Sequence, residues 1–253
     1  VHDLSFLHFP KHIKKTHLLF YKRYTPKFLA KAKTIATVSD FSKQDIIKHY
    51  KTPEEKISVI YSAAKEIFKP VEESVKEAVK NKYTQGKEYF IYIGAIHPRK
   101  NLLNILKAFS IFKKRQQSNF KLIIAGRLAW KNDKLIESLK AYKYREDVIM
   151  PGYVEENELV NLQASAYCLV YPSLYEGFGV PPLEAMQCHV PVITSQNSSM
   201  QEICGDAALY ADPRSHTDIA DKMMLIYKDE TLRNGLIKKG NEVCKQYSWD
   251  RTA

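Results

Sequence analysis

Hydrophobic residues in the second part of the chain form short runs that alternate with amphipathic helical patterns. Leu102, Leu106, Phe109 and Phe112, for example, recur at the spacing of one helix face. Apolar runs that are bounded by turn residues and separated by helices are typical of parallel strands joined by crossover helices. From residue 89 onward the pattern therefore predicts a doubly wound α/β domain. The expected strands span residues 89–95, 120–126, 148–152, 167–172, 190–195 and 208–211.

The earlier part of the chain shows less of this pattern. It predicts strands over residues 34–38 and 57–61 with a helix between them. That helix is expected to begin with a capping box formed by Ser42 and Asp45. A single strand–helix–strand unit cannot bury its own sheet. We therefore expect residues 1–64 to be the carboxyl-terminal part of a truncated first domain.

A charged stretch separates the two parts. Residues 65–87 are rich in lysine and glutamate, include Pro70 and Gly86, and lack an apolar run of strand length. We expect a linker here, which leaves residues 88–253 as the second domain. The chain starts at Val1 rather than at a methionine, and no signal-peptide pattern follows, so we expect further sequence upstream.

The charge along the chain is uneven. The net charge is +11, and residues 1–62 carry 12 lysines and arginines against 5 acidic residues, whereas the remainder carries 27 against 23. A basic and aromatic stretch without acidic residues suits an anionic surface, either phospholipid headgroups or a phosphorylated acceptor, but it is equally compatible with a solvated helix face. No nucleic-acid-binding motif accompanies it, so we expect no nucleic-acid partner. The stretch contains Lys11, Lys14, Lys15, Lys22, Arg23, Lys27, Lys31 and Lys33 together with Phe20, Tyr21, Tyr24 and Phe28.

Cysteine usage and hydrophobicity narrow the class of protein. The four cysteines, Cys168, Cys188, Cys204 and Cys244, include no CxxC pair, and no histidines cluster at metal-ligand spacing. We expect free buried thiols in a reducing compartment and no metal site. The apolar runs are far shorter than the roughly 20 residues of a membrane-spanning helix. We therefore expect a cytoplasmic protein, one that could still associate with the cytoplasmic face of a membrane.

The most specific motif, YEGFGVPPLEA at residues 175–185, follows the strand predicted to end at residue 172. Ligands bind outside the carboxyl ends of strands in open α/β sheets. Gly177 and Gly179 let backbone N–H groups approach a ligand closely. The prolines that follow can begin a helix whose amino-terminal amides attract phosphate. The motif therefore predicts a phosphate-binding loop.

Two glutamates, Glu176 and Glu184, bracket this loop with seven residues between them. Carboxylates at such positions are good acceptors for sugar hydroxyls, although a helix-capping turn with incidental glutamates would read similarly. The pair and its Gly-Phe-Gly-x-Pro loop resemble the signature of glycosyltransferase family 4, enzymes of the GT-B fold. The resemblance implies a Rossmann-like donor domain at the carboxyl end, preceded here by a truncated Rossmann-like domain.

The resemblance also implies roles for the residues of the loop. Glu176 would contact the donor hexose and the charge that develops near its anomeric centre, and Glu184 would bind the ribose hydroxyls. The main chain would bind the rest of the donor, at Gly177, Phe178 and Gly179 for the hexose and at Val180, Pro181 and Leu183 for the diphosphate.

A second motif, GAIHPRKN at residues 94–101, follows the first strand of the same domain. It delivers Arg99 and Lys100 to the same sheet edge, where fixed cations would stabilise the negative charge that grows on a leaving diphosphate. Alone, the two cations would be ordinary surface charge. The resemblance assigns them a catalytic role and places Gly94 at the donor, with no metal or other cofactor required.

Three weaker signals complete the candidate site. Tyr153 and Val154 follow a strand-end glycine and resemble the family segment that meets the nucleotide base, while Arg127 is a strand-end residue that could reach the donor. Val1-His2-Asp3 resembles the His-Asp motif of the family's first domain. His2 is therefore a candidate catalytic residue, and Asp3 is expected to be structural.

The sequence departs from the family pattern in two places. A family glycine behind the second glutamate is missing from residues 185–192, which alters a turn rather than a ligand contact. The amino-terminal half-domain with the glycine-rich acceptor loop is also missing, so this chain could bind the donor without supporting transfer.

Together these features predict a retaining hexosyltransferase of mannosyl or glucosyl type in polysaccharide biosynthesis. Its expected partners are a nucleotide diphosphate sugar, a glycan or lipid-linked acceptor and, peripherally, an anionic membrane. Two alternatives stay open. One is an epimerase or phosphorylase on the same scaffold, and the other is a non-catalytic module that binds nucleotide sugars.

Overall fold

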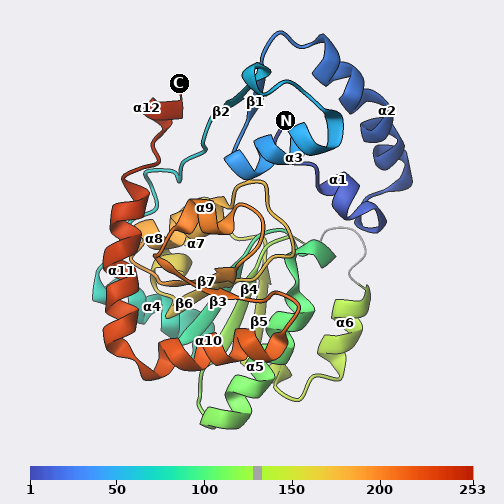
Figure 1. Cartoon of the computed structure of the whole chain (residues 1–253). Coiled ribbons are helices and arrows are strands. Elements are labelled where there is room, and N and C mark those ends of the chain that lie inside the picture. Colours follow the sequence, from blue (N-terminus) through green and yellow to red (C-terminus); the bar gives the residue numbers. More distant parts are fainter. Residues whose placement is uncertain (128–132, 253) are drawn as a thin grey trace.

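The computed structural model describes residues 1–127 and 133–252 and shows a smaller amino-terminal unit seated on a larger α/β unit (Figure 1). The larger unit is built on a six-stranded, fully parallel sheet with strand order β5-β4-β3-β6-β7-β8. The strands are β3 (Tyr89–Ile93), β4 (Lys121–Ala125), β5 (Val148–Gly152), β6 (Cys168–Tyr171), β7 (Val192–Ser195) and β8 (Ala208–Ala211). Each lies within the apolar runs that the sequence indicates.

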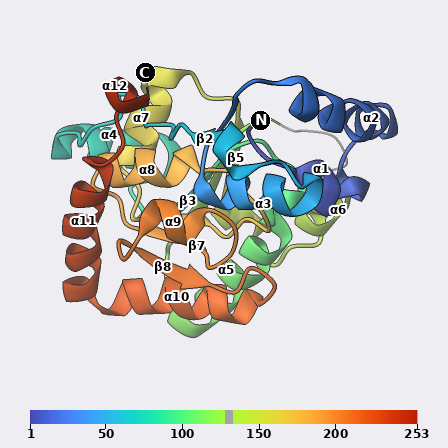
Figure 2. The same cartoon turned by 45° about the horizontal axis from the view of Figure 1, so that its top comes forward.

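The central strands are buried along their whole length, which explains their continuous hydrophobic runs. Every residue of β3, β6 and β7 is buried. Helices cover both faces of the sheet, as in a doubly wound fold (Figures 1 and 2). The helices of this unit are α4 (Glu73–Thr84), α5 (Leu102–Gln116), α6 (Asp133–Lys140), α7 (Glu156–Ala164), α8 (Val180–Gln187), α9 (Met200–Cys204), α10 (His216–Lys228) and α11 (Glu230–Cys244), with short 3-10 turns at Pro98–Lys100 and Arg145–Asp147.

The strand order reverses between β3 and β6, which are neighbours in the sheet although far apart in sequence. From β3 the chain continues outward through β4 to β5, and from β6 it continues in the opposite direction through β7 to β8. The loops after β3 and β6 therefore lie on either side of a topological switch point, the position where open α/β sheets bind ligands.

The amino-terminal unit surrounds a two-stranded parallel sheet of β1 (Ile35–Thr37) and β2 (Ile57–Val59). Its core joins Leu4, Phe6, Leu29 and Ile46. The other elements are α1 (Ser5–His8), α2 (Lys15–Lys31), α3 (Asp40–Tyr50) and the 3-10 turns Pro10–His12 and Glu54–Lys56. The predicted strands are confirmed within two residues at each end.

The predicted capping box is wrong, because α3 begins earlier. Its N-cap is Ser39, whose side chain accepts a hydrogen bond from the backbone N–H of Ser42. Asp45 is buried in the middle of the helix and accepts from the Tyr175 hydroxyl of the larger unit. The carboxylate of Glu202, also from the larger unit, accepts hydrogen bonds at the start of α3, so part of the cap is long-range.

The stretch predicted to be a linker contains α4, which packs against α7 of the larger unit. At the other end of the chain, α12 (Trp249–Thr252) returns to the amino-terminal unit, where the Thr252 hydroxyl donates to the Tyr61 carbonyl at 2.6 Å. The chain therefore crosses between the two units twice. The domain limits at residues 64 and 88 stay a prediction.

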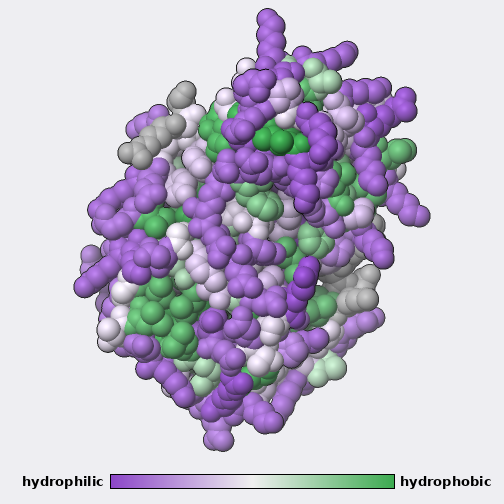
Figure 3. All heavy atoms as spheres, in the orientation of Figure 1, coloured by the Kyte–Doolittle hydropathy of each residue, from purple (hydrophilic) through white to green (hydrophobic). Residues whose placement is uncertain are grey.

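Hydrophilic side chains cover most of the face shown in Figure 3, with smaller hydrophobic patches between them. Among the described residues, no helix is both long and apolar enough to cross a lipid bilayer. All four cysteines are free thiols, as expected, and Cys244 is half-buried whereas the other three are buried.

Candidate active site

The loops after β3 and β6 meet at the switch point because the two strands are parallel neighbours that end at the same edge of the sheet. The Leu174 backbone N–H donates to the Arg99 carbonyl at 2.9 Å, which joins the loops through their main chains. Asn101 Nδ2 adds a second link by donating to the Pro172 carbonyl at 2.9 Å. This main-chain framework sets the positions of the charged side chains.

Glu176 lies at the centre of the site and is 6% exposed. Lys100 Nζ lies 2.6 Å from its Oε1, and an Arg99 guanidinium nitrogen lies 3.2 Å from its Oε2. Burial raises the pKa of a carboxyl group, but here Lys100 and Arg99 outweigh it, so the pKa of Glu176 is lowered. Glu176 is therefore a buried carboxylate that forms ion pairs with two cationic side chains.

The two cations differ in their environment. Burial lowers the pKa of Lys100, and Glu176 only partly offsets this effect. For Arg99, Glu176 and then Asp3 oppose burial, and the pKa is raised. Lys100 also donates to the Tyr171 hydroxyl at 2.6 Å, and the Tyr171 ring stacks on Tyr92 with 5.8 Å between centroids. The ammonium group is thus held from two sides.

The glycine loop is packed tightly against the amino-terminal segment. A Cβ atom on Gly177 would lie 2.5 Å from the His2 carbonyl oxygen, so only glycine fits there. The hydroxyls of Ser39 and Ser42 donate to the Gly177 carbonyl at 2.5 and 3.2 Å. Gly179 precedes α8 with a φ of 111°, in the left-handed region that favours glycine.

A layer of hydroxyl groups behind the loop supports its main chain. The Ser199 side chain donates to the carbonyls of Glu176 and Phe178, and the Glu176 N–H donates to Ser198 Oγ. Val180, Pro181 and Leu183 lie in the first turn of α8, which points its amino-terminal end toward this loop. Backbone amides at such an end favour a phosphate ligand.

His2 and Asp3 lie against this loop. The His2 carbonyl accepts a hydrogen bond from Ser42 Oγ at 3.2 Å. The His2 side chain is exposed and lines a cavity of about 350 Å³. Asp3 lies just before α1, and its Oδ1 accepts a hydrogen bond at 2.8 Å from the N–H of Ser5, the first residue of that helix. Its charge also acts on Arg99 and Lys100. Asp3 thus has the expected structural contact and an electrostatic effect on the site.

Glu184 occupies a different part of the same edge. Burial raises its pKa to about 7, and its charged neighbours are Lys65 and Glu156 rather than Arg99 and Lys100. Lys65 forms an ion pair with Glu156 and also lies near Tyr153. The two signature glutamates therefore mark two ends of the candidate site, one beside the paired cations and one beside Lys65.

The weaker candidates lie at the edge of this region. The Arg127 guanidinium stacks over the Tyr153 ring, 4.1 Å from its centroid, and Tyr153 is 56% exposed, whereas Val154 is buried. Gly94 directly follows β3, and its N–H donates to the Ala125 carbonyl. A flat, exposed arginine–tyrosine pair is a surface on which a planar base could stack.

Sequence reasoning missed several residues that shape the site. They are Tyr171, Lys65, Ser198, Ser199, and the hydroxyls of Ser39 and Ser42. A signal existed for part of this set, because the run SQNSS at residues 195–199 begins at the last residue of β7 and so lies at the same sheet edge.

The comparison with family models decides the family. The model described as glycosyl transferases group 1 matches residues 74–243, which is more than half of the chain. The chain belongs to this family. The match starts in α4 and ends in α11, so it covers the whole six-stranded sheet and both loops of the candidate site.

Relatives and solved structures agree with this assignment. The chain is 34% identical over 252 residues to an O-antigen chain mannosyltransferase B of Escherichia coli, covering 98% of this chain and 66% of that protein. It aligns with the glycosyltransferase WaaG at a TM-score of 0.79 and 17% identity, covering 96% of this chain and 68% of WaaG. Anabaena HepE in complex with UDP and glucose gives a TM-score of 0.79 at 17% identity, with 94% and 64% covered. The likeness to these structures shows that this group 1 chain has the fold of GT-B enzymes, of which it spans about two thirds.

Proposed function

We propose that the protein transfers a hexose from a nucleotide diphosphate sugar to a glycan or lipid-linked acceptor, with retention of the anomeric configuration. One observation carries the proposal: Arg99 and Lys100 converge on the buried carboxylate of Glu176 at the switch point of the sheet. An activated sugar needs cations for its diphosphate and a carboxylate for its hexose, and this edge offers both.

The chemistry follows from the charges. When the bond between the anomeric carbon and the phosphate oxygen breaks, negative charge grows on the diphosphate and positive charge grows on the sugar ring. Arg99 and Lys100 would stabilise the first charge, and Glu176 would stabilise the second. Because Glu176 now pairs with both cations, the diphosphate would take over part of that pairing when the donor binds.

The other end of the donor would lie toward Glu184. This carboxyl group would bind the ribose hydroxyls, while the surface formed by Arg127 and Tyr153 would receive the base. His2 would approach the hexose from the amino-terminal unit. The name of the O-antigen relative makes mannose the first hexose to test, and the UDP and glucose bound to HepE make UDP-glucose the second donor.

The acceptor side of the proposal rests on the amino-terminal unit. The exposed basic and aromatic residues of α2, among them Phe20, Phe28 and Lys27, would hold the enzyme at an anionic membrane where lipid-linked acceptors are found. We place this contact at the cytoplasmic face.

Donor binding is tested with the 253-residue chain. A panel of UDP- and GDP-sugars should include one that raises the melting temperature, since a ligand at about 100 times its dissociation constant adds about 2.7 kcal/mol of stability. Glu176→Gln should keep the fold. Its matched control is Glu77→Gln, on the exposed face of α4. A chain that no nucleotide sugar stabilises would contradict the donor site.

Transfer is tested with the protein that carries the whole amino-terminal domain. Glu176→Gln should lower turnover by about 100- to 1,000-fold, and Glu77→Gln should leave it unchanged. The anomeric configuration of the product, measured by proton NMR, should match that of the donor. Conversion of the donor into an isomer would instead identify an epimerase, and binding without turnover would identify a non-catalytic module.

A further inference from the structure

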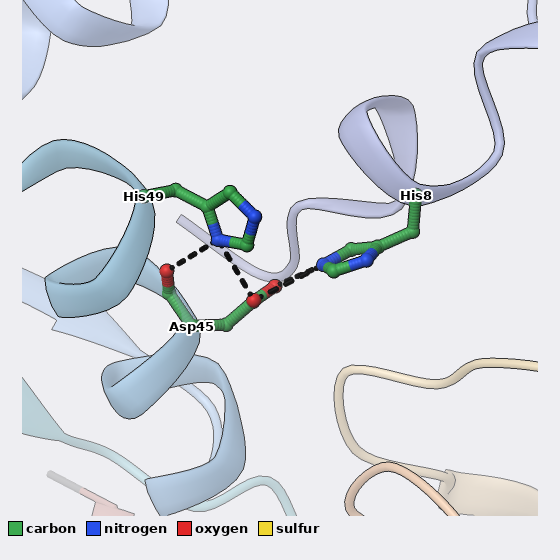
Figure 4. Close-up of side chains that lie close together, drawn as sticks. All are labelled: His8, Asp45 and His49. Carbon is green, nitrogen blue, oxygen red and sulfur yellow. Dashed lines mark hydrogen bonds and ion pairs between the residues drawn. The ribbon is translucent and has the colours of Figure 1, made fainter.

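A cluster of potential metal ligands lies on the amino-terminal unit, beside the candidate active site. Asp45 and His49 stand one turn apart on α3, and His8 at the end of α1 faces them (Figure 4). One ligand atom from each of the three residues lies within 4.8 Å of the others. Two ligands at i and i+4 on a helix are a recurrent arrangement in zinc sites, and here another element supplies the third.

The distances bring all three side chains to one point. His8 Nε2 lies 3.0 and 2.8 Å from the two carboxylate oxygens of Asp45. His49 Nδ1 lies 3.0 Å from Asp45 Oδ1 and also hydrogen-bonds the Asp45 backbone carbonyl at 3.0 Å, which leaves Nε2 as the nitrogen of His49 that would bind a metal. Asp45 is 7% exposed, whereas the side chains of His8 and His49 are 32% and 31% exposed. The carboxylate therefore forms the floor of the cluster, and the open side faces solvent.

The surroundings of the carboxylate fit a metal ligand. The Tyr175 hydroxyl donates to Asp45 Oδ2 at 2.8 Å, and the Tyr175 ring stacks on His8 with 4.8 Å between centroids. Ligating carboxylates and imidazoles are usually oriented by such outer contacts. Here a single residue orients two of the three ligands.

We propose that His8, Asp45 and His49 bind one divalent transition-metal ion, for which zinc is the best match. Two imidazoles and one carboxylate, with water in the fourth position, suit tetrahedral zinc, whereas magnesium prefers oxygen ligands in an octahedron. The ion would tie α1 to α3. Because the Tyr175 hydroxyl donates to Asp45, the ion would also hold Tyr175, the residue directly before Glu176, in place.

This site is distinct from the transfer chemistry, because none of its three ligands belongs to the residues proposed to bind the donor. Sequence spacing does not indicate this site, since His8 lies 37 residues before Asp45. Metal binding can therefore be measured without any nucleotide sugar, and its result does not depend on whether the donor site is correctly assigned.

The test is a titration of the chain, freed of metal with a chelator, with zinc chloride and separately with magnesium chloride in a calorimeter. We expect one zinc ion per chain and no comparable heat from magnesium. His8→Gln and His49→Gln, both at solvent-exposed side chains, should each weaken zinc binding at least tenfold. His17→Gln, at an exposed histidine on α2, is the matched control and should bind zinc like the unmodified chain.

Two further measurements keep the result clear. Circular dichroism should show that His8→Gln and His49→Gln stay folded. Cobalt added in place of zinc should give the visible absorption of a tetrahedral site in the unmodified chain and in His17→Gln, but not in these two variants. Tyr175→Phe should weaken zinc binding about tenfold or more through the loss of the outer hydrogen bond. Zinc isotherms that are the same in His8→Gln, His49→Gln and the unmodified chain would overturn the proposal, as would the absence of zinc binding.

Discussion

At the residue scale, the two signature glutamates have the same side chain, yet their surroundings shift its pKa in opposite directions. Glu176 faces two cations and its pKa is lowered, whereas burial raises the pKa of Glu184 to about 7 with only Lys65 opposing it. Near neutral pH the first is a carboxylate and the second is partly protonated. A protonated carboxyl group can donate a hydrogen bond to a ribose oxygen, which an ionised one cannot.

Replacement of Glu184 by Gln should remove a pH dependence of stability. Between pH 4.5 and about 7 the folded chain holds a proton on Glu184 that the unfolded chain has released. The free energy of unfolding should therefore fall as the pH rises through this window, by at most about 3 kcal/mol.

Urea unfolding of both proteins near pH 5 and near pH 8 measures this effect. The difference between them isolates Glu184, because all other groups titrate in both. If the unmodified chain and Glu184→Gln lost equal stability between the two pH values, the raised pKa would be wrong.

The charged centre of the site could be predicted residue by residue, but its support could not. Arg99 and Glu176 each follow an apolar strand, and the parallel sheet brings both strand ends to one edge. The hydroxyls of Ser39 and Ser42 act on the Gly177 carbonyl from more than 130 residues away. Such contacts depend on how two units pack, which local pattern does not encode.

At the scale of elements, burial decides which ones the sequence reveals. The sheet strands were predictable because each is an unbroken apolar run. Helix α4 was hidden in a stretch of lysine and glutamate, since only Val79 and Thr84 among its residues are buried. The expected start of α3 is wrong because Ser39 and Ser42 can both cap a helix. The contacts that favour the earlier start, from the backbone N–H groups of Asp40 and Phe41 to Glu202, are long-range.

The packing of the glycine loop against the first residues of the chain can be tested with a matched pair of glycines. In Gly177→Ala the new methyl would lie 2.5 Å from the His2 carbonyl oxygen and 2.8 Å from the Asp3 Cβ. We expect a loss of about 1–3 kcal/mol, the usual cost of overpacking. Gly235, inside α11, has nothing within 4 Å of the same position. Gly235→Ala should therefore stabilise the chain by about 0.5–1 kcal/mol.

Thermal and urea unfolding of the two variants provide the measurement. Opposite signs are expected, because one methyl enters a packed contact and the other enters open space at a helical position. Equal stabilisation by both substitutions would show that the loop and the amino-terminal segment are not in contact.

At the scale of the whole molecule, α2 exposes most of its apolar and basic side chains. It lies on the outer side of the amino-terminal unit, away from the six-stranded sheet (Figures 1 and 2). Only Thr25 and Leu29 of this helix are buried, whereas Leu19, Phe20 and Phe28 are 69%, 50% and 58% exposed. Exposed apolar rings among lysines are typical of helices that lie in a membrane interface.

Removal of charge from α2 should therefore weaken binding to anionic vesicles. Lys22, Arg23 and Lys27 are all exposed, and each cation near such a surface contributes about 1 kcal/mol. The triple change to glutamine should lower the partition coefficient onto phosphatidylglycerol vesicles by about 100-fold, measured by co-sedimentation at low salt.

The control removes the same charge elsewhere. Lys107, Lys114 and Lys228 are exposed on α5 and α10, helices of the larger unit that pack against each other. Their triple change to glutamine lowers the net charge equally but should leave vesicle binding almost unchanged, because the attraction acts within about a Debye length of the surface. Equal losses in both triple variants would mean that net charge, rather than the position of α2, drives the association.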